Sequence, residues 1–264
     1  MLAPLLALGL AAFDTLPLPN RIVLPSDAIP SERAAADLLV RELRTLTGAE
    51  VQIADKIPRG AVLFVGRSAE LDKRHPGTEW TSLGSEGFVL ETAGGDVIVA
   101  GGRPRGTLYA AEELLARLGR RVLAADCTVV PKAKIPARVP ALHVREVPRL
   151  EYRDPYFTEA FDPAFAVPNR ANGFLDRLGD AEGGRVAYAH FVHTFYEIVP
   201  PSKYFTEHPE YFAQVFDKRL SANAQLCLSN PDVLKIAIET VKEWFRAAPE
   251  ASIASVSQND CFNP

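Results

Sequence analysis

The sequence of 264 residues has only three cysteines and one methionine, and it contains no long basic run. The cysteines are far apart, odd in number and without CxxC spacing, which argues against a zinc ribbon and against a complete disulfide framework. A net charge of −4 without a basic run removes nucleic acid from the expected partners. We expect no metal and no cofactor. A disulfide between Cys227 and Cys261 stays open as an alternative to free thiols.

The sequence also lacks an apolar run long enough to cross a bilayer, which takes about 20 residues. Its N-terminal run, MLAPLLALGLAA, is shorter and resembles a signal peptide without the basic n-region. We therefore predict a signal peptide and leader over residues 1–19, and a secreted or periplasmic protein. A mis-assigned start or a short packing segment is the alternative.

The chain is 47% apolar, which is enough for one large or two modest domains. Residues 20–131 predict a small α/β domain with two helices on one face of a mostly antiparallel sheet. Gly94-Gly95 lies between two apolar runs and indicates a hairpin. Ser31 is the predicted N-cap of the first helix, and Gly48 is its predicted end. The predicted strands are 21–24, 51–54, 61–65, 87–91 and 96–100, and the second predicted helix is 107–118.

Prolines punctuate residues 132–148, a segment that we interpret as a linker running over the protein surface. Residues 149–264 then alternate between strand-like and helix-like patterns, which predicts a parallel sheet. Polar residues at the carboxyl ends of the strands indicate a (β/α)8 barrel, of which about half of the units are present. The predicted strands are 150–153, 186–191, 225–228 and 252–256, and the predicted helices are 164–175 and one capped by Asn230.

Residues 86–123, EGFVLETAGGDVIVAGGRPRGTLYAAEELLARLGRRVL, are similar to the accessory domain that precedes the barrel in bacterial β-hexosaminidases and xylan α-glucuronidases. Residues 129–264 resemble an uncharacterised bacterial family related to these glycosidases. The matching pieces are VVPK, PRLEYRDPYF, NRANG, FVHTF, VPPSKYF, HPEYF, QLCLSNP and SVSQND. The resemblance implies a hexosaminidase-type α+β accessory domain followed by an incomplete TIM barrel over residues 149–264.

The resemblance also implies two site residues. In hexosaminidases an arginine in a P-R-x-x-x-R-type first strand binds sugar hydroxyls, and residues 148–153 match this pattern and put Arg153 there. Many barrel glycosidases carry the acid/base carboxylate at the end of the fourth strand, where this chain has Asp260 in place of the usual, longer glutamate. Gln258 and Asn259 precede Asp260 as candidates to orient a sugar hydroxyl. A plain loop carboxylate is the alternative for Asp260.

His190 and His193 lie at the end of the second predicted strand, in a long connection rich in aromatic residues. Histidines offer neutral donors and acceptors to hydroxyls, and aromatic rings offer flat faces for stacking. We therefore predict that both histidines contact a sugar. Buried structural histidines are one alternative. A metal site shared with His208 is another, although no HExxH motif and no carboxylate ligand accompany them.

Together these features predict the N-terminal portion of a glycoside hydrolase of the hexosaminidase or α-glucuronidase type, acting on a polysaccharide or glycan. The chain stops at residues 257–264 directly after an apolar run, so we expect it to be inactive alone as the front part of a larger enzyme. The alternatives are a non-catalytic carbohydrate-binding or structural module and a fragment without independent function. A carbohydrate is the expected partner, and the oligomeric state stays open.

Overall fold

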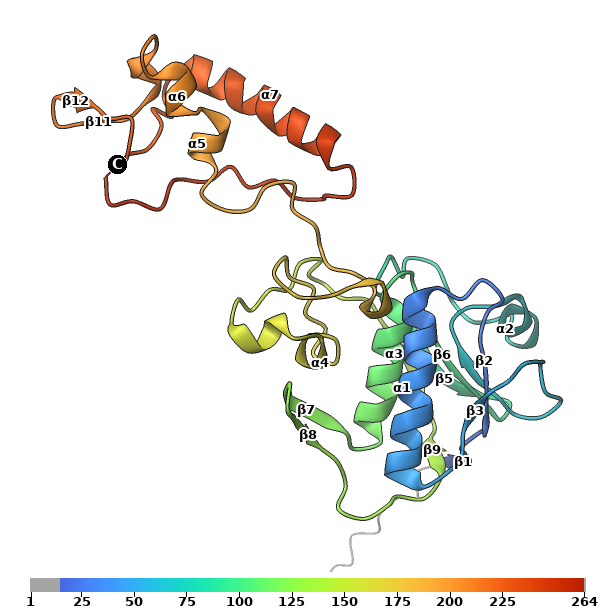
Figure 1. Cartoon of the computed structure of the whole chain (residues 1–264). Coiled ribbons are helices and arrows are strands. Elements are labelled where there is room, and N and C mark those ends of the chain that lie inside the picture. The colour runs from blue at the N-terminus through green and yellow to red at the C-terminus, as the bar shows by residue number, and fades with distance from the viewer. Residues whose placement is uncertain (1–14, 264) are drawn as a thin grey trace, which may run out of the picture. The chain divides into compact units, whose positions relative to one another are not determined.

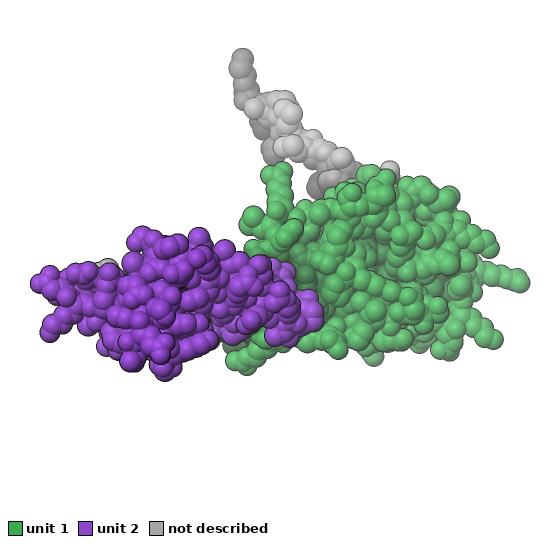
Figure 2. Space-filling model, turned by 90° about the horizontal axis from the view of Figure 1, so that it is seen from above, with its two compact units in different colours: residues 1–185 green, residues 186–264 purple. Residues whose placement is uncertain are grey.

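The computed structural model describes residues 15–263 (Figure 1). It contains two compact units, coloured separately in Figure 2: unit 1 ends at Arg185 and unit 2 begins at Val186. Most of the predicted signal peptide and leader, residues 1–14, lies outside the described residues. Among the helices of the described part, none is long and apolar enough to cross a membrane.

A six-stranded sheet in the order β10-β5-β6-β4-β2-β3 forms the centre of unit 1. The β2–β3, β2–β4 and β4–β6 pairs are parallel, whereas β5 pairs antiparallel with β6 and β10. The prediction of a mostly antiparallel sheet is therefore wrong. Helical and loop crossovers bring the chain back to the end of the sheet where the previous strand began, so the next strand runs in the same direction. The strands are β2 (Arg21–Val23), β3 (Gln52–Ile53), β4 (Leu63–Val65), β5 (Phe88–Ala93), β6 (Asp96–Gly101) and β10 (His143–Glu146).

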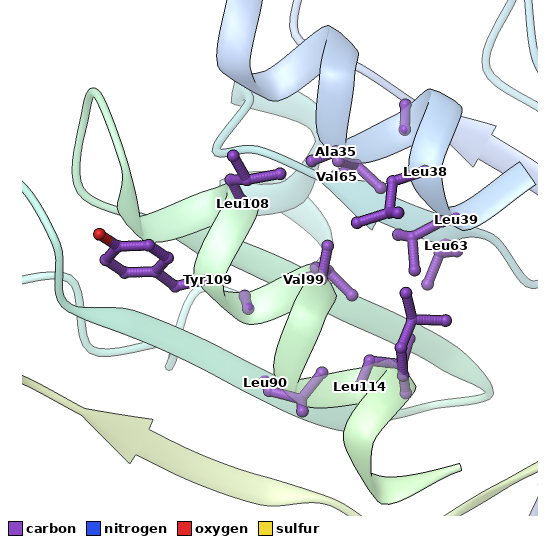
Figure 3. Close-up of a cluster of buried hydrophobic side chains, with 14 of the residues drawn as sticks. Ala35, Leu38, Leu39, Leu63, Val65, Leu90, Val99, Leu108, Tyr109 and Leu114 are labelled. Atoms are coloured by element: carbon purple, nitrogen blue, oxygen red, sulfur yellow. The ribbon is translucent and has the colours of Figure 1, made fainter. Parts of the chain in front are cut away.

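Helices α1 (Pro30–Thr47) and α3 (Gly106–Arg117) pack side by side on one face of this sheet, as Figure 1 shows. Side chains alternate between the two faces along each strand. Leu63 and Val65 of β4 belong to the core under α1 and α3 (Figure 3), whereas Phe64 packs on the other face with Leu71 of α2 (Ala69–Arg74). The predicted hairpin and both long helices are confirmed, and α2 is an element that the sequence pattern did not predict.

Helix α1 begins at a different cap from the predicted one. Its N-cap is Ile29, and the Glu32 carboxylate accepts a hydrogen bond from the Ile29 backbone N–H at 3.0 Å. Ser31 lies in the first turn, where its hydroxyl donates to the carbonyl of Pro104. The end of the helix is the predicted one, since Gly48 adopts φ 77° in the left-handed region that favours glycine.

The predicted linker contains two strands of unit 1. One is β9 (Arg138–Pro140), which pairs with β1 (Thr15–Pro17), and the other is β10 at the edge of the main sheet. A further pair, β7 (Arg121–Ala124) with β8 (Cys127–Val129), follows α3. The packing boundary therefore falls later in the chain than the linker.

Residues 149–185 pack in unit 1 without forming the first predicted βα pair. They contain no strand, and their helical turns are η1 (Thr158–Phe161), α4 (Pro163–Ala166) and η2 (Asp180–Glu182). Pro155 closely follows the predicted strand, and Pro168 interrupts the predicted helix 164–175. Val167, Ala171 and Leu178 instead join the main core of unit 1.

Unit 2 consists of short helices, a small hairpin and one long helix. Its elements are α5 (Phe195–Ile198), α6 (Pro201–Tyr204), η3 (Pro209–Tyr211), β11 (Gln214–Val215), β12 (Lys218–Arg219) and α7 (Pro231–Ala247). Helix α7 begins at the predicted cap, where Asn230 Oδ1 accepts a hydrogen bond from the Asp232 N–H at 2.8 Å. Its buried face packs on Phe195, Ile198 and Phe212.

The three strands predicted in unit 2 are present only as isolated bridges. Tyr188 bridges Ile253 in parallel, and Phe212 bridges Leu226 in antiparallel orientation. Within the described part of unit 2, no two strands are paired across a helix, and the incomplete barrel is not confirmed. A strand needs a ladder of backbone partners. In unit 2, side-chain hydroxyls and amides instead form hydrogen bonds with many of the backbone groups.

Candidate functional site

Two segments of unit 2 run in parallel, and their carboxyl ends bring together most of the predicted site residues. Ser252 N–H donates to Ala187 O at 3.1 Å, Ala189 N–H to Ile253 O at 2.8 Å, and Ser255 N–H to His190 O at 3.0 Å. The residues that follow these segments therefore lie at one end. We call this group the unit 2 cluster, which consists of His190, His193, Glu197, Gln225, Gln258, Asn259 and Asp260.

The buried hydroxyl of Thr194 fixes this end of the two segments. Its Oγ1 donates to Ser255 O at 2.8 Å and accepts from the Ser257 N–H at 3.1 Å. The Ser257 hydroxyl accepts from the His193 N–H at 2.8 Å. These bonds satisfy backbone groups that would otherwise need a strand partner, and they hold His193 against residues 257–258.

His193 is exposed and adopts φ 61°, a left-handed conformation that is uncommon for residues other than glycine. Its Nδ1 lies 3.0 Å from the carbonyl oxygen of Gln258. Because a carbonyl only accepts, Nδ1 carries the proton in the neutral ring and Nε2 is an acceptor. Nε2 makes no hydrogen bond with a described residue, so it is available to a ligand hydroxyl.

His190 is held by two neighbours that the sequence pattern did not connect with it. Its Nδ1 lies 2.6 Å from Glu197 Oε2, and its ring stacks on Trp244 with centroids 3.9 Å apart and planes at 19°. Trp244 comes from α7 and Glu197 from α5, so only the packing of unit 2 brings them together. His190 therefore has one ring nitrogen and one ring face engaged within unit 2.

Asn259 supports the cluster through its backbone and side chain. Its N–H donates to Gln225 Oε1 at 2.8 Å, and Gln225 Nε2 donates to Asn259 O at 2.9 Å. The Asn259 side chain accepts from the Tyr196 N–H at 3.3 Å and donates to Ala224 O at 2.9 Å. Both polar atoms of its amide are therefore engaged within the protein.

Gln258 and Asp260 flank Asn259 and differ from it. Both are exposed, and their side chains make no hydrogen bond or ion pair within residues 15–263. Together with His193 Nε2, they form the part of the unit 2 cluster that is open to a ligand.

Arg153 belongs to unit 1, where it is an anchor. Its guanidinium donates to both carboxylate oxygens of Glu86 at 2.8 and 2.9 Å, and to the carbonyls of Arg170 at 2.7 Å and Leu150 at 2.6 Å. Burial raises the pKa of Glu86, but hydrogen bonds from Arg153 and Asn172 outweigh it and leave the pKa below its ordinary value. Glu86 also binds Arg105 at 2.6 Å. This network ties residues 149–172 to the sheet domain.

The structure bears on two alternatives, a metal site that includes His208 and a disulfide between Cys227 and Cys261. His208 pairs with Glu210 at 3.0 Å and stacks on Tyr211, and no group of three His, Cys, Asp or Glu side chains in the described part could hold a metal ion. All three cysteines are free, so the Cys227–Cys261 disulfide is not formed.

Comparison with protein families gives matches along nearly the whole chain. Residues 122–264 match the model of a domain of unknown function, DUF4838, over more than half of the sequence. The chain belongs to this family. Residues 14–114 match the model of the glycosyl hydrolase family 67 N-terminus. The predicted relation to glycoside hydrolases is confirmed at this level.

No curated protein matches the sequence. Eighty chains of solved structures match it. One is described as "A novel family GH115 4-O-Methyl-alpha-glucuronidase, BtGH115A, with specificity for decorated arabinogalactans", with 16% sequence identity and a TM-score of 0.48. The match covers 87% of this DUF4838 chain and 34% of the other, so the chain spans about a third of that protein's length.

Proposed function

We propose that this DUF4838 protein is the N-terminal portion of a carbohydrate-active enzyme of the glycoside hydrolase type, related to α-glucuronidases and β-hexosaminidases. The observation that carries the proposal is the match of residues 14–114 to the glycosyl hydrolase family 67 N-terminus. The domain that matches is followed by the unit 2 cluster, whose open groups suit sugar hydroxyls: an imidazole acceptor on His193, the amide of Gln258 and the carboxylate of Asp260.

In this proposal Asp260 is the proton donor. Its carboxyl proton passes to the glycosidic oxygen as the bond between that oxygen and the anomeric carbon breaks, and a second group, either a carboxylate or the acetamido group of the substrate, supports the positive charge at that carbon. Glu197 is the other carboxylate of the cluster. Because it pairs with His190, its role in this proposal is to hold that histidine in place.

A non-catalytic carbohydrate-binding module is the second candidate, favoured by the exposure of the cluster. His193, Gln258 and Asp260 are all exposed. General acid catalysis by an aspartic acid needs a pocket that excludes water and keeps the acid protonated near neutral pH. We therefore propose that the 264-residue chain binds glycans and does not hydrolyse them.

The experiment measures binding and turnover separately. Affinity electrophoresis of the 264-residue chain in polysaccharide gels should show retardation, while no reducing ends are released. Asp260→Asn should weaken retardation, and Glu243→Gln on the exposed side of α7 is the matched control. Release of reducing ends that Asp260→Asn abolishes would replace the binding-module candidate with hydrolysis by this chain. Lack of retardation in every gel would contradict both candidates.

In a longer form of the protein with a closed site, Asp260→Asn tests the acid role itself. Loss of a proton donor slows departure of a poor leaving group far more than that of an activated aryl group. Turnover of an unactivated glycoside should therefore fall much more than turnover of an aryl glycoside. Equal and minor losses on both substrates would remove Asp260 from the acid role.

Secretion is a separate proposal, supported by the apolar run at residues 1–12. Fusion of residues 1–19 to a reporter that is active only after export should give export, and Leu5→Arg within the apolar run should abolish it. A reporter that stays in the cytoplasm would contradict the proposal.

A further inference from the structure

Unit 1 has a cleft of its own at the carboxyl ends of its parallel strands. One pocket of about 810 Å³ is lined by the loops after β2 and β3, at residues 24–27 and 54–57, and by residues 67–70 and Asp72, where α2 begins after β4. A second pocket of about 430 Å³ is lined by residues 82–84 and by 101–103 after β6. Asp27 and Arg67 line both, so the two pockets adjoin. We call them together the unit 1 cleft. In open α/β sheets, ligands bind in the crevice outside the carboxyl ends of the strands.

Arg67 lies between the two pockets with its orientation fixed and its end groups available. Its Nε donates to both Asp72 oxygens at 3.1 and 3.2 Å, and its guanidinium lies over the Trp80 ring, 5.2 Å from the centroid. The side chain is 52% exposed. Its two terminal nitrogens make no hydrogen bond within residues 15–263, so they can donate together to neighbouring hydroxyls of a ligand.

Arg103 and Glu32 line the cleft, but their charged groups are engaged with each other and are not available to a ligand. Arg103 donates to both oxygens of the buried Glu32 at 2.9 Å and to Asp27 at 2.8 Å. The hydrogen bond from Arg103 also lowers the pKa of Asp27, which is therefore ionised at neutral pH. Asp27 remains largely exposed, so its carboxylate can still accept hydrogen bonds from a ligand.

We propose that the unit 1 cleft is a second glycan-binding site, which takes an uncharged oligosaccharide through Arg67, Asp27 and Trp80. Its lining carries both signs of charge and is net acidic, which disfavours an anionic polymer. The cations are Lys56, Arg67 and Arg103, and the anions are Asp27, Glu32, Asp55, Glu70 and Asp72. A planar donor pair and a carboxylate are groups that bind vicinal hydroxyls, and Trp80 lines the cleft beside them. The size of each pocket suits a small ligand. The choice of a glycan rests on the proposed function.

The two tryptophans of the chain separate the two sites in one experiment. Trp80 lines the unit 1 cleft and Trp244 stacks on His190 of the unit 2 cluster. The Trp244→Phe chain therefore emits from Trp80 alone, and the Trp80→Phe chain emits from Trp244 alone. Each is titrated with neutral xylan, arabinan and galactan oligosaccharides and with polygalacturonate, after circular dichroism has verified the fold.

We expect a saturable change in Trp80 emission with at least one neutral oligosaccharide and a weaker one with polygalacturonate. Adding Arg67→Ala should raise the Kd at least about tenfold, since a hydrogen bond to a charged group contributes about 1.5–3 kcal/mol. Arg44→Ala, an exposed arginine outside the cleft, should leave the Kd unchanged.

The remaining outcomes overturn one proposal or the other. A change in Trp244 emission alone would support the unit 2 cluster and overturn the unit 1 cleft. A change in Trp80 emission alone, lost with Arg67→Ala, would support the cleft and count against the cluster. An unchanged Kd in Arg67→Ala, a preference for polygalacturonate, or no response from Trp80 would each overturn the cleft proposal.

Discussion

Units 1 and 2 satisfy their backbones and fill their cores in different ways. Unit 1 has a six-stranded sheet with a buried apolar cluster on each face, and the larger cluster contains 27 residues. The cluster in unit 2 contains seven, and α7 leaves Leu234 and Ile238 exposed. In unit 2 the hydroxyl of Thr194 and the amides of Gln225 and Asn259 replace a strand ladder.

Side chains are held in position by different interactions in the two units. A sheet fixes its side chains through many equivalent backbone bonds, so losing one of them matters little. The unit 2 cluster depends on a few side chains, each of which holds one segment in place. Unit 1 should therefore be the more stable unit, and the geometry of unit 2 should be the more sensitive to single substitutions outside its core.

Hydrogen exchange on the whole chain tests the comparison most directly. Amides of β4, β6 and α3 should exchange at least about a thousandfold more slowly than those of residues 252–256, because core elements open only on global unfolding. The measurement is exchange followed by peptide mass spectrometry at neutral pH. Similar protection of both regions would contradict the comparison, since it would mean that the side-chain hydrogen bonds of unit 2 protect backbone amides as well as a sheet does.

Glu86→Gln should be the most damaging polar substitution in unit 1. It leaves Arg105 and Arg153 partly buried without a carboxylate, so we expect a loss of about 3–5 kcal/mol in the free energy of unfolding, measured by urea denaturation. The exposed Glu50→Gln is the control and should change it by less than about 0.5 kcal/mol.

The contribution of Glu86 also has a defined pH dependence. Its folded pKa is lowered, so the stabilisation is present above the unfolded pKa of about 4.3 and is lost as pH falls through the lower folded pKa. The difference between the wild-type chain and Glu86→Gln should therefore shrink below about pH 4. A constant difference down to pH 3 would contradict the assignment.

Asp176→Asn should stabilise unit 1, with the opposite pH dependence. Burial raises the pKa of Asp176 to about 6 from 3.8, and one of its oxygens has no hydrogen-bond partner in the described part. Ionisation therefore costs stability as pH rises from about 4 through 6. The substitution should add about 1–3 kcal/mol at pH 7.5 and almost nothing at pH 4. The exposed Asp180→Asn should show no such change, and a gain that is equal at both pH values would contradict the role of ionisation.

Asn230→Ala in unit 2 should have the smallest effect. It removes the cap on Asp232 N–H at the start of α7 and should cost about 1 kcal/mol. Circular dichroism and urea denaturation report the loss, and Asn230→Ser, which keeps a capping oxygen, should restore most of it. A similar loss with serine would show that packing, and not capping, holds the first turn.

Several elements were predictable because their signals are local. The hairpin at Gly94-Gly95, the end of α1 at Gly48 and the Asn230 cap of α7 each depend on a few neighbouring residues with restricted backbone conformations. The strand predicted at 150–153 is absent, and those predicted at 186–191, 225–228 and 252–256 are present only as isolated bridges. A strand forms only where a partner segment runs beside it over several residues.

Residue type and spacing alone specified α1, α3 and α7, the end of α1 at Gly48, the Asn230 cap, the hairpin and the resemblance to glycoside hydrolases. Tertiary structure alone decided that β2, β4 and β6 run in parallel, which creates the unit 1 cleft. It also decided that Arg153 binds Glu86 and that His190 stacks on Trp244. Those contacts join residues far apart in the chain. No local pattern specifies them, because each arises from how whole elements pack.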